Sequence, residues 1–571
     1  MVFTVSEDVF PLMSPHKNEL HEALKNDQYE EARTLIRHLH FRILTECYEN
    51  YAGYSPPSYK SSLHLIAGLT DADQATRLCQ QLLHGVKKVK KREHLLNATV
   101  VEQLMFGRQR VHARVAAIHI AAYNGNIGVV KVLCKEEYGV DINCSTSETL
   151  EGPTRQKGLT PLYWAAVNRQ TELVKTLIDI AGVNTSCSDD GDTALHVASR
   201  YGHIELVILL LEHQADVNAS RNTDGATPVY VAARYGHIEV LKLLVDHNAD
   251  VNARNTNGAM PLYAAAWNGH TEVVKLLVDH KADVNAKNTD GATPLYIAVQ
   301  NGHTRVVKLL IDHNADVNVC KRTDGVRPLW IAAENGYTEV VKLLIDHNAD
   351  VNASRHTHGD TPLYAAACYG HTEVVKLLVN HKADVNASDT DGGTPLYIAA
   401  QNGHTEVVKL LIDHNADLNA SRHTHGYTPL YAAVYNRHTE VVKLLVDHNA
   451  DVNASGHTDG ATPLYIATQN GHTEVMKLLI DHKADVNVRR HTDGATPVYI
   501  AAQKGHLEVV KLLIDHKANV NASHINGATP LYIADQNRHT EVVKLLRDNN
   551  ANQWRRRVSS FGSEGDNWEG D

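Results

Sequence analysis

The feature that most constrains this chain is a segment that recurs every 33 or 34 residues. Its most regular part reads T-P-L-Y, as at 361–364. Pro261 and Pro294 lie 33 residues apart, and Pro294 and Pro328 lie 34 apart. Such a period indicates a repeat architecture, in which each repeat is stabilised by its neighbours. A chain of 571 residues is too long for one compact core, so stacked repeats are the expected solution.

Each repeat predicts two helices and a turn. Thr293 can cap a helix that begins at Pro294, because the missing N–H of proline costs nothing at that position. Gly302 then ends this helix in the left-handed conformation. A second helix with a broad apolar stripe follows, and Asn314 turns the chain left-handed again. The expected fold class is an all-α repeat solenoid with short β-hairpin fingers between repeats.

The repeat resembles a known family. Its consensus, G-x-T-P-L-Y-x-A-A-x-N-G-H-x-E-V-V-K-L-L-x-x-x-A-D-V-N-A, is similar to the ankyrin repeat, whose pattern is T-P-L-H-x-A-A followed by G-H and A-D-V-N. The resemblance covers Val115 to about Ala551. The family histidine is usually tyrosine here, although His119 and His196 keep it. The resemblance implies a curved stack of ankyrin repeats that binds a partner in a concave groove formed by first helices and finger tips.

The predicted organisation has four parts, namely an N-terminal segment (1–14), a degenerate helical capping region with insertions (15–114), the repeat array (115–551) and a disordered tail (552–571). Asp535 and Arg547 stand where other repeats carry apolar residues, as the last repeat of an array requires. The individual repeats are expected near residues 115–144, 158–187, 191–220, 225–254, 258–287, 291–320, 325–354, 359–388, 392–421, 426–455, 460–489, 494–523 and 527–551.

Charge and cysteine content limit the function classes. The chain has 55 Lys and Arg against 66 Asp and Glu, a net charge of −11, which argues against non-specific polyanion binding. Seven cysteines form no C-x-x-C pair, which favours a reducing compartment. The N-terminus lacks a signal-peptide pattern, and no apolar run is long enough for membrane insertion. We expect a cytoplasmic protein; the basic cluster Lys87–Arg92 leaves a nuclear location as the alternative to a solvated insertion loop.

The sequence predicts neither catalysis nor a cofactor. It contains no Gly-rich phosphate loop, no H-E-x-x-H and no G-x-S-x-G. Histidine is abundant, but most of it recurs in every repeat, which favours a structural role. The R-H-T-H-G segments at 355–359 and 422–426 each offer two imidazoles, and two ligands make a weak metal site. We therefore expect no metal, no cofactor and no enzyme.

The positions that vary between repeats point to partner binding. They are the pair after Ala-Ala in the first helix and the tip of the finger, both concave in the related family. Exposed aromatic residues there would act as anchors, against the alternative of neutral drift between copies. The candidate partner-binding residues are Arg234, Tyr235, Trp267, Gln300, Glu334, Tyr369, Gln401, Tyr435, Gln469 and Lys504 on first helices, and Arg254, Arg322, Arg355, Arg422 and Arg490 on fingers.

These residues predict a non-catalytic scaffold or adaptor that binds a protein segment, acidic if the basic finger tips contact it. The array is expected to be monomeric. Polyanion or nucleic-acid binding through the finger arginines is the alternative, weakened by acids beside them. A spacer whose activity comes from a bound partner is a third interpretation. Candidate modification sites are Ser559, which follows three arginines, and the asparagines Asn285, Asn386 and Asn487, which resemble sites of the asparaginyl hydroxylase that modifies ankyrin repeats.

Overall fold

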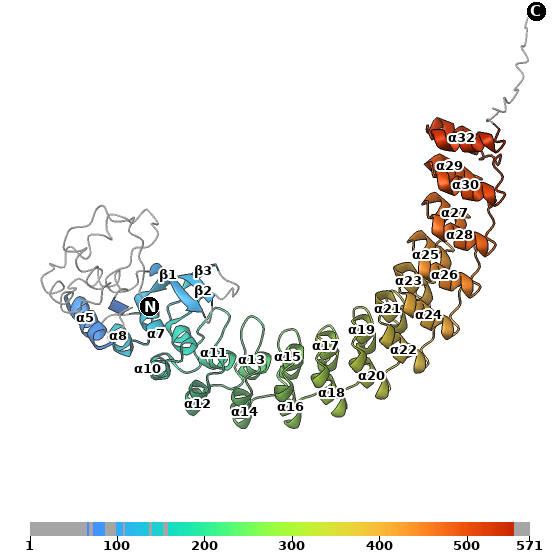
Figure 1. The fold of residues 1–571 in the computed structure, drawn as a ribbon. Helices are drawn as coiled ribbons and strands as arrows, with labels where there is room; N and C mark the ends of the chain where they lie inside the picture. The colour runs from blue at the N-terminus through green and yellow to red at the C-terminus, as the bar shows by residue number, and fades with distance from the viewer. Residues whose placement is uncertain are drawn as a thin grey trace, which may run out of the picture. The chain divides into compact units, whose positions relative to one another are not determined.

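The computed structural model consists of two stacks of repeats (Figure 1). The described residues up to 289, together with 312–314, form the first stack; residues 290–311 and 315–552 form the second. The segments predicted as the N-terminal segment and the tail, and the cluster Lys87–Arg92, lie outside the described residues. The structure describes residues 66–67, 72–85, 99–106, 109–135, 140–151 and 158–552.

The first stack begins with a helix and a small sheet. Helix α5 (Ala72–Gly85) precedes strands β1 (Thr99–Phe106) and β2 (Gln109–Ala116), and β3 (Ser147–Glu151) follows the first repeat. The strands are antiparallel in the order β1-β2-β3. Within the region predicted over 15–114 as a helical cap with insertions, these residues therefore form strands and not helix. Both strands are rich in valine, which favours pleated structure over helix.

The remaining helices of the first stack come in pairs, one pair per repeat. The first helix of each repeat packs on the first helix of the next repeat, and the second helix packs on the next second helix. Neighbouring repeats thus bury each other's apolar faces. The pairs are α7 (Ala117–Asn124) and α8 (Ile127–Leu133), α9 (Pro161–Val167) and α10 (Thr171–Ala181), α11 (Ala194–Tyr201) and α12 (Ile204–Glu212), α13 (Pro228–Tyr235) and α14 (Ile238–Asp246), and α15 (Pro261–Asn268) and α16 (Thr271–Asp279).

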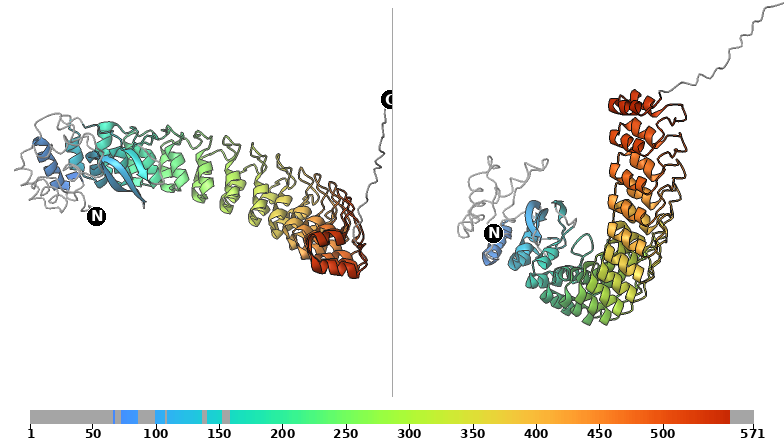
Figure 2. Two further views of the ribbon diagram at one scale, coloured as in Figure 1. Left: turned by 90° about the horizontal axis from the view of Figure 1, so that it is seen from above. Right: turned by 45° about the vertical axis from the view of Figure 1, so that its right-hand side comes forward.

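The second stack repeats this pair with little change (Figure 2). Its helices are α17 (Pro294–Gln300) and α18 (Thr304–Asp312), α19 (Pro328–Glu334) and α20 (Thr338–Asp346), α21 (Pro362–Tyr369) and α22 (Thr372–Asn380), α23 (Pro395–Asn402) and α24 (Thr405–Asp413), α25 (Pro429–Tyr435) and α26 (Thr439–Asp447), α27 (Pro463–Gln469) and α28 (Thr473–Asp481), α29 (Pro497–Lys504) and α30 (Leu507–Asp515), and α31 (Pro530–Gln536) and α32 (Thr540–Asp548).

The local signals in the repeat act as the sequence predicts. The Tyr296 N–H donates to Thr293 Oγ1 at 3.2 Å and so caps α17. Gly302 and Asn314 both adopt the left-handed conformation, with φ of 71° and 64°. The solenoid is confirmed, but the predicted β-hairpin fingers are not seen. From residue 158 onward, the described chain carries a single isolated β-bridge, between Ser186 and Thr193.

The finger segments are instead turns that connect one repeat to the next through a backbone hydrogen bond. The Arg322 N–H donates to the Asp290 carbonyl at 2.9 Å, and the His356 N–H donates to the Asp324 carbonyl at 3.0 Å. Each turn therefore supports its neighbour, as expected of a solenoid held together between nearest neighbours. No helix in the described part of the chain is both long and apolar enough to cross a bilayer.

Candidate partner-binding surface

The repeated histidines have structural roles. In most repeats a histidine stands just before the second helix and reaches the end of the first helix of the previous repeat. His371 Nε2 lies 2.9 Å from the Glu334 carbonyl oxygen, and His404 Nε2 lies 3.0 Å from the Cys368 carbonyl oxygen. The histidine that ends each second helix bonds its own helix, as His347 Nδ1 does to the Leu343 carbonyl oxygen at 2.9 Å. Among the described residues, no three potential ligands gather where a metal could bind.

The repeated asparagines join consecutive repeats. Asn352 Oδ1 accepts the Asp384 N–H at 2.8 Å, and Asn386 Oδ1 accepts the Asp417 N–H at 2.8 Å. The asparagine side chain thus contacts the backbone of the following repeat. This contact explains why the residue recurs without requiring any modification.

The variable ends of the first helices carry four exposed aromatic side chains. Tyr235 is 47% exposed, Trp267 51%, and Tyr369 and Tyr435 are each 56% exposed. The sequence predicts exposure at these positions, since most other repeats have glutamine or glutamate where Trp267 and Tyr435 stand, and asparagine where Tyr235 and Tyr369 stand. Large aromatic side chains left half in water are unusual, because burial of such groups is strongly favourable. Within the array, the Trp267 ring lies 6.2 Å from that of Tyr263, and the Tyr369 ring stacks on that of His371 at 6.2 Å.

Polar residues at the equivalent positions surround these rings. Arg234, Gln300 and Lys504 are exposed, whereas Glu334, Gln401 and Gln469 are half-buried. Burial raises the pKa of the Glu334 carboxyl, and this carboxylate in turn is the main cause of the raised pKa of Tyr369. Glu334 and Tyr369 therefore share one neighbourhood, although they belong to consecutive repeats.

The finger arginines of the second stack behave differently from the prediction. Arg254 and Arg322 are exposed, as expected of a basic finger edge. By contrast, the Arg355 guanidinium lies 4.2 Å from the Trp330 ring centroid, and its Nε donates to Asp360 Oδ1 at 2.7 Å. Trp330 Nε1 donates to the other carboxylate oxygen of Asp360 at 3.2 Å. Arg355 is thus engaged inside the array.

Arg422 and Arg490 follow the same rule. Arg422 lies 4.9 Å from the Tyr397 ring centroid and pairs with Asp389 at 3.0 Å. Arg490 lies 5.3 Å from the centroid of Tyr465 and pairs with Asp493, whose pKa this partner lowers to about 2. The three half-buried arginines cover the aromatic residue of their own repeat. They are therefore structural, and their charges are neutralised by carboxylates.

A signal for this role is present in the sequence. The finger residue lies 25 positions after the aromatic residue it covers, as 355 is after 330. The pairs at this offset include His524, which stacks on Tyr499 with centroids 5.1 Å apart, and Asp389, which the Tyr364 hydroxyl hydrogen-bonds. The finger tip therefore varies together with the repeat's own packing, and its variation alone does not indicate a partner.

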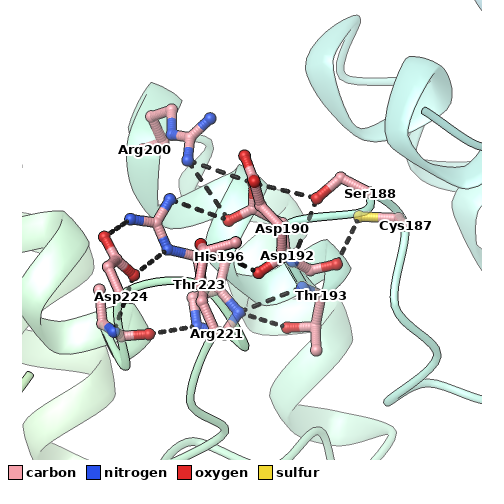
Figure 3. A network of polar contacts seen from close by, with 11 residues as sticks. Cys187, Ser188, Asp190, Asp192, Thr193, His196, Arg200, Arg221, Thr223 and Asp224 are labelled. Carbon is pink, nitrogen blue, oxygen red and sulfur yellow. Dashed lines mark hydrogen bonds and ion pairs between the residues drawn. The ribbon is translucent and has the colours of Figure 1, made fainter. Parts of the chain in front are cut away.

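The sequence gives no warning of a buried polar network in the first stack (Figure 3). Asp192 is fully buried and pairs with Arg200 at 3.2 Å and with Arg221 at 3.5 Å. Arg221 also pairs with Asp224. Next to this network, His196 Nδ1 accepts the Thr193 N–H, and burial lowers the histidine pKa to about 4. Six repeats have alanine at the position equivalent to Asp192, and Asp360 is its equivalent in the second stack.

Comparisons with known proteins agree with this architecture. The chain is 36% identical over 97 residues to palmitoyltransferase ZDHHC13 of Mus musculus, which covers 16% of this chain and 15% of that protein. It is 33% identical over 120 residues to the probable E3 ubiquitin-protein ligase XBOS31 of Oryza sativa subsp. japonica, 21% of this chain and 24% of that protein. It is 32% identical over 100 residues to the serine/threonine-protein kinase TNNI3K of Mus musculus, 17% of this chain and 11% of that protein. The chain thus spans less than a quarter of each of these relatives.

The repeats themselves match a family model across nearly the whole described chain. The model of three consecutive ankyrin repeats matches residues 63–179, 118–221, 216–288, 281–355, 353–422, 420–490 and 489–557. The first match begins within the region predicted as a degenerate cap. Together with the paired helices, the left-handed turns and the contacts between neighbouring repeats, these matches show that the chain belongs to the ankyrin-repeat family.

Proposed function

We propose that this protein is a non-catalytic adaptor that binds a partner protein through the ends of its first helices. The observation that carries the proposal is the set of exposed aromatic residues Tyr235, Trp267, Tyr369 and Tyr435. Tyr and Trp are the residue types that most often dominate binding energy at protein interfaces. Ankyrin repeats generally mediate protein–protein interaction, and stacked repeats present extended surfaces for it.

The charge of the free side chains favours an acidic partner segment. With Arg355, Arg422 and Arg490 paired to carboxylates, the exposed cations among the candidate residues are Arg234, Arg254, Arg322 and Lys504. Arg254 Nη1 also donates to the Gly258 and Lys287 carbonyl oxygens at 3.0 and 2.8 Å. So few available cations favour a peptide with a few acidic residues over a polyanion. The same neutralisation weakens the alternative of nucleic-acid binding through the fingers.

Affinity capture with a matched control tests the proposal. We expect a variant with Trp267, Tyr369 and Tyr435 changed to alanine to lose the partner proteins that the parent chain recovers from its host. The control changes one exposed lysine on the second helix of each of the same repeats to alanine, namely Lys275, Lys376 and Lys443. Both variants should melt close to the parent chain, because all six side chains are largely exposed.

Two results would contradict the proposal. The first is recovery of the same proteins by the aromatic variant and the parent chain. The second is recovery of nucleic acid in place of protein, with affinity that falls steeply as salt is raised, since release of counterions governs polyanion binding. A large fall in melting temperature of the aromatic variant would assign these rings to the core instead.

A further inference from the structure

Exposed aliphatic side chains gather on two neighbouring second helices of the first stack. Among the described residues, the large aliphatic side chains that stand exposed are Ile180, Ile204, Ile208 and Ile525. Ile180 is the penultimate residue of α10, and Ile204 and Ile208 lie on α12, which packs against α10. Both helices belong to the row of second helices (Figure 1), so this surface is separate from the ends of the first helices.

Ile208 replaces a residue that the array otherwise keeps. Every other second helix, from α8 to α32, has lysine at this position, as Lys175 in α10 and Lys242 in α14. Ile204 stands where most second helices begin with threonine. Ile208 is 40% exposed and Ile204 38%. Because residues four apart on a helix are neighbours on one face, these two side chains form a continuous apolar patch.

The loss of this lysine also leaves a carboxylate without the partner that it has in α14. There, Lys242 Nζ donates to Glu239 Oε1 at 2.9 Å. Glu205 is the equivalent acid of α12, and no lysine follows it three residues later. Glu205 and Glu212 are both exposed, and α12 contains no basic residue. Within its own helix, the apolar patch is therefore bordered by acids alone.

We propose that this face of α12, which consists of Ile204, Glu205, Ile208 and Glu212 and which we call the isoleucine face, docks an amphipathic helix of a partner protein. Aliphatic side chains of that helix pack on Ile204 and Ile208. Lysine or arginine residues seven positions apart pair with Glu205 and Glu212. The proposal adds a second binding surface to the one proposed on the first helices, so two partners can bind at once.

The isoleucine face selects a helix because it offers side chains alone. The backbone N–H and C=O groups in the middle of α12 are bonded within the helix, so they cannot pair with an extended strand. A strand or irregular segment that covered the isoleucines would lose water from backbone groups that then have no partner, whereas a helix satisfies its own backbone. Packed helices approach to about 8–10 Å, which lets their aliphatic side chains interdigitate.

The charges of this surface require a basic partner. Glu205 and Glu212 are seven residues apart, which is about two turns and about 10.5 Å along the helix. Basic residues seven apart on a partner helix have the same spacing and stay on one face. The two neighbouring second helices do not reverse the charge, because each adds one exposed lysine, Lys175 or Lys242, against two exposed acids. Those acids are Glu172 and Asp179 on α10, and Glu239 and Asp246 on α14.

A single exposed isoleucine would carry no such argument, because scattered apolar residues are normal on protein surfaces. Ile525, which lies in a turn of the second stack, is of that kind. Ile204 and Ile208 differ because they adjoin each other, and because a third exposed isoleucine lies on the helix packed beside them. Contiguous apolar surface with a polar rim is typical of interaction sites.

Binding of labelled peptides to the full chain tests the proposal by fluorescence anisotropy. The probe is a peptide of three Lys-Leu-Ala-Ala-Leu-Lys-Ala heptads, which as a helix has a leucine face flanked by lysines. We expect saturable binding that Ile208→Lys weakens by about tenfold or more, as loss of a buried anchor commonly does. This variant restores the residue of the other second helices, so it should fold as the parent chain does. Ile204→Thr restores the common residue without a change of charge and should also weaken binding.

Two further peptides separate charge from apolar contact. One has glutamate in place of every lysine, and the parent chain should bind it at least about tenfold more weakly, because like charges would face Glu205 and Glu212. Changing both of these residues to glutamine should remove most of that preference. The other peptide has the composition of the probe in a shuffled order without an apolar face, and it should not bind saturably. Trp267→Ala, on the first-helix surface, should bind the probe as the parent chain does.

Several results would overturn the proposal. They are absence of saturable binding, equal binding of the probe and the shuffled peptide, unchanged binding by both Ile204→Thr and Ile208→Lys, and loss of binding in Trp267→Ala. Sedimentation of the parent chain as a dimer that Ile208→Lys dissociates would also overturn it, because a second copy of the chain would then occupy the isoleucine face. None of these results affects capture of proteins that depends on Trp267, Tyr369 and Tyr435, so the proposed function is tested separately.

Discussion

Arg437 lies in a repeat that we expect a single substitution to stabilise. It directly follows the first helix α25 and its capping Asn436, at the position where other repeats have glycine, and it adopts φ of 62°. Gly403, its equivalent one repeat earlier, has φ of 79°. A residue with a Cβ atom in this left-handed region is disfavoured by about 1 kcal/mol relative to glycine.

Arginine at position 437, in place of the usual glycine, also alters the contact with the next repeat. A Cβ built on Gly403 would lie 2.5 Å from Nδ1 of His438, so the imidazole of the following repeat occupies the space that glycine leaves. His438 Nε2 lies 3.0 Å from the Gln401 carbonyl oxygen. His472, the equivalent histidine in the repeat after Arg437, departs from this pattern. Its Nδ1 lies 3.2 Å from the Val434 carbonyl oxygen, which is one residue earlier in the first helix than the equivalent of Gln401.

We therefore predict that Arg437→Gly stabilises the protein locally by about 1 kcal/mol, with any gain from His472 in addition. A repeat array opens piecemeal, so the effect belongs to the repeats around the change. The equilibrium for local opening should fall about fivefold, since 1.4 kcal/mol corresponds to a factor of about ten. Hydrogen exchange of peptides from residues 426–489 measures it, with the urea midpoint of the full chain as a second readout.

Two variants serve as controls. Gly403→Ala should destabilise its repeat by at least the same amount, because the new Cβ meets both the left-handed strain and His438. Arg169→Gly should be nearly neutral. Arg169 also has positive φ, but its Nε donates to His203 Nδ1 at 2.8 Å, and loss of that hydrogen bond offsets the relief of strain. The reasoning is refuted if Arg437→Gly leaves exchange unchanged or faster while Gly403→Ala costs nothing.

Three further predictions address pH and modification. Burial lowers the His196 pKa from 6.5 to about 4. The neutral histidine therefore contributes up to about 3 kcal/mol to the free energy of unfolding above pH 6.5, and this contribution is lost as the pH falls toward 4. Limited proteolysis at pH 7 and pH 5 should detect opening of this repeat in the parent chain and less in His196→Tyr, and equal opening would contradict it. Asn285, Asn386 and Asn487 each follow a strained left-handed lysine, namely Lys281, Lys382 and Lys483. Where an ankyrin-directed asparaginyl hydroxylase is present, mass spectrometry should find one added oxygen on these asparagines. Absence of this mass shift rules the modification out. Ser559 lies outside the described residues, and a basophilic kinase should phosphorylate a peptide spanning 553–565; failure to label it ends that idea.

Local chemistry explains why much of the array is predictable from sequence. Helix capping by threonine, left-handed glycine and asparagine, and an apolar stripe act over a few residues, and the repeat displays each of them many times. The exposure of Trp267 and Tyr435 follows from the same regularity, since a helix position occupied by glutamine in one repeat faces water in the next. The strands β1 and β2 lie outside the repeated pattern. No second copy of these segments was therefore available for comparison, and the prediction of a helical cap missed both strands.

The finger arginines show where the comparison of repeats misleads. Arg355 varies between repeats as a partner-binding residue would, yet it covers Trp330 and pairs with Asp360. Its environment comes from residues 25 positions before it and 5 positions after it. Sequence variation between copies therefore has two physical causes, contact with a partner and adjustment to a changed neighbour, and only the structure separates them here.

The repeat that lacks a finger side chain makes this separation explicit. Gly456 occupies the position of Arg355, 25 residues after Tyr431, and offers nothing to cover that ring. Tyr427 covers the ring instead, since it stacks on Tyr431 with centroids 3.9 Å apart and planes 2° apart, and a Cβ built on Gly456 would lie 2.5 Å from Tyr427 Cε1. Tyr427 stands where six repeats have alanine, so the loss of a side chain at position 456 is matched by the gain of one at position 427. Tyr435, in the same repeat, remains 56% exposed. A variable residue that stays exposed in the folded array is therefore a stronger candidate for a partner contact than one that packs against its own repeat, and this criterion favours the first-helix aromatics over the half-buried finger arginines.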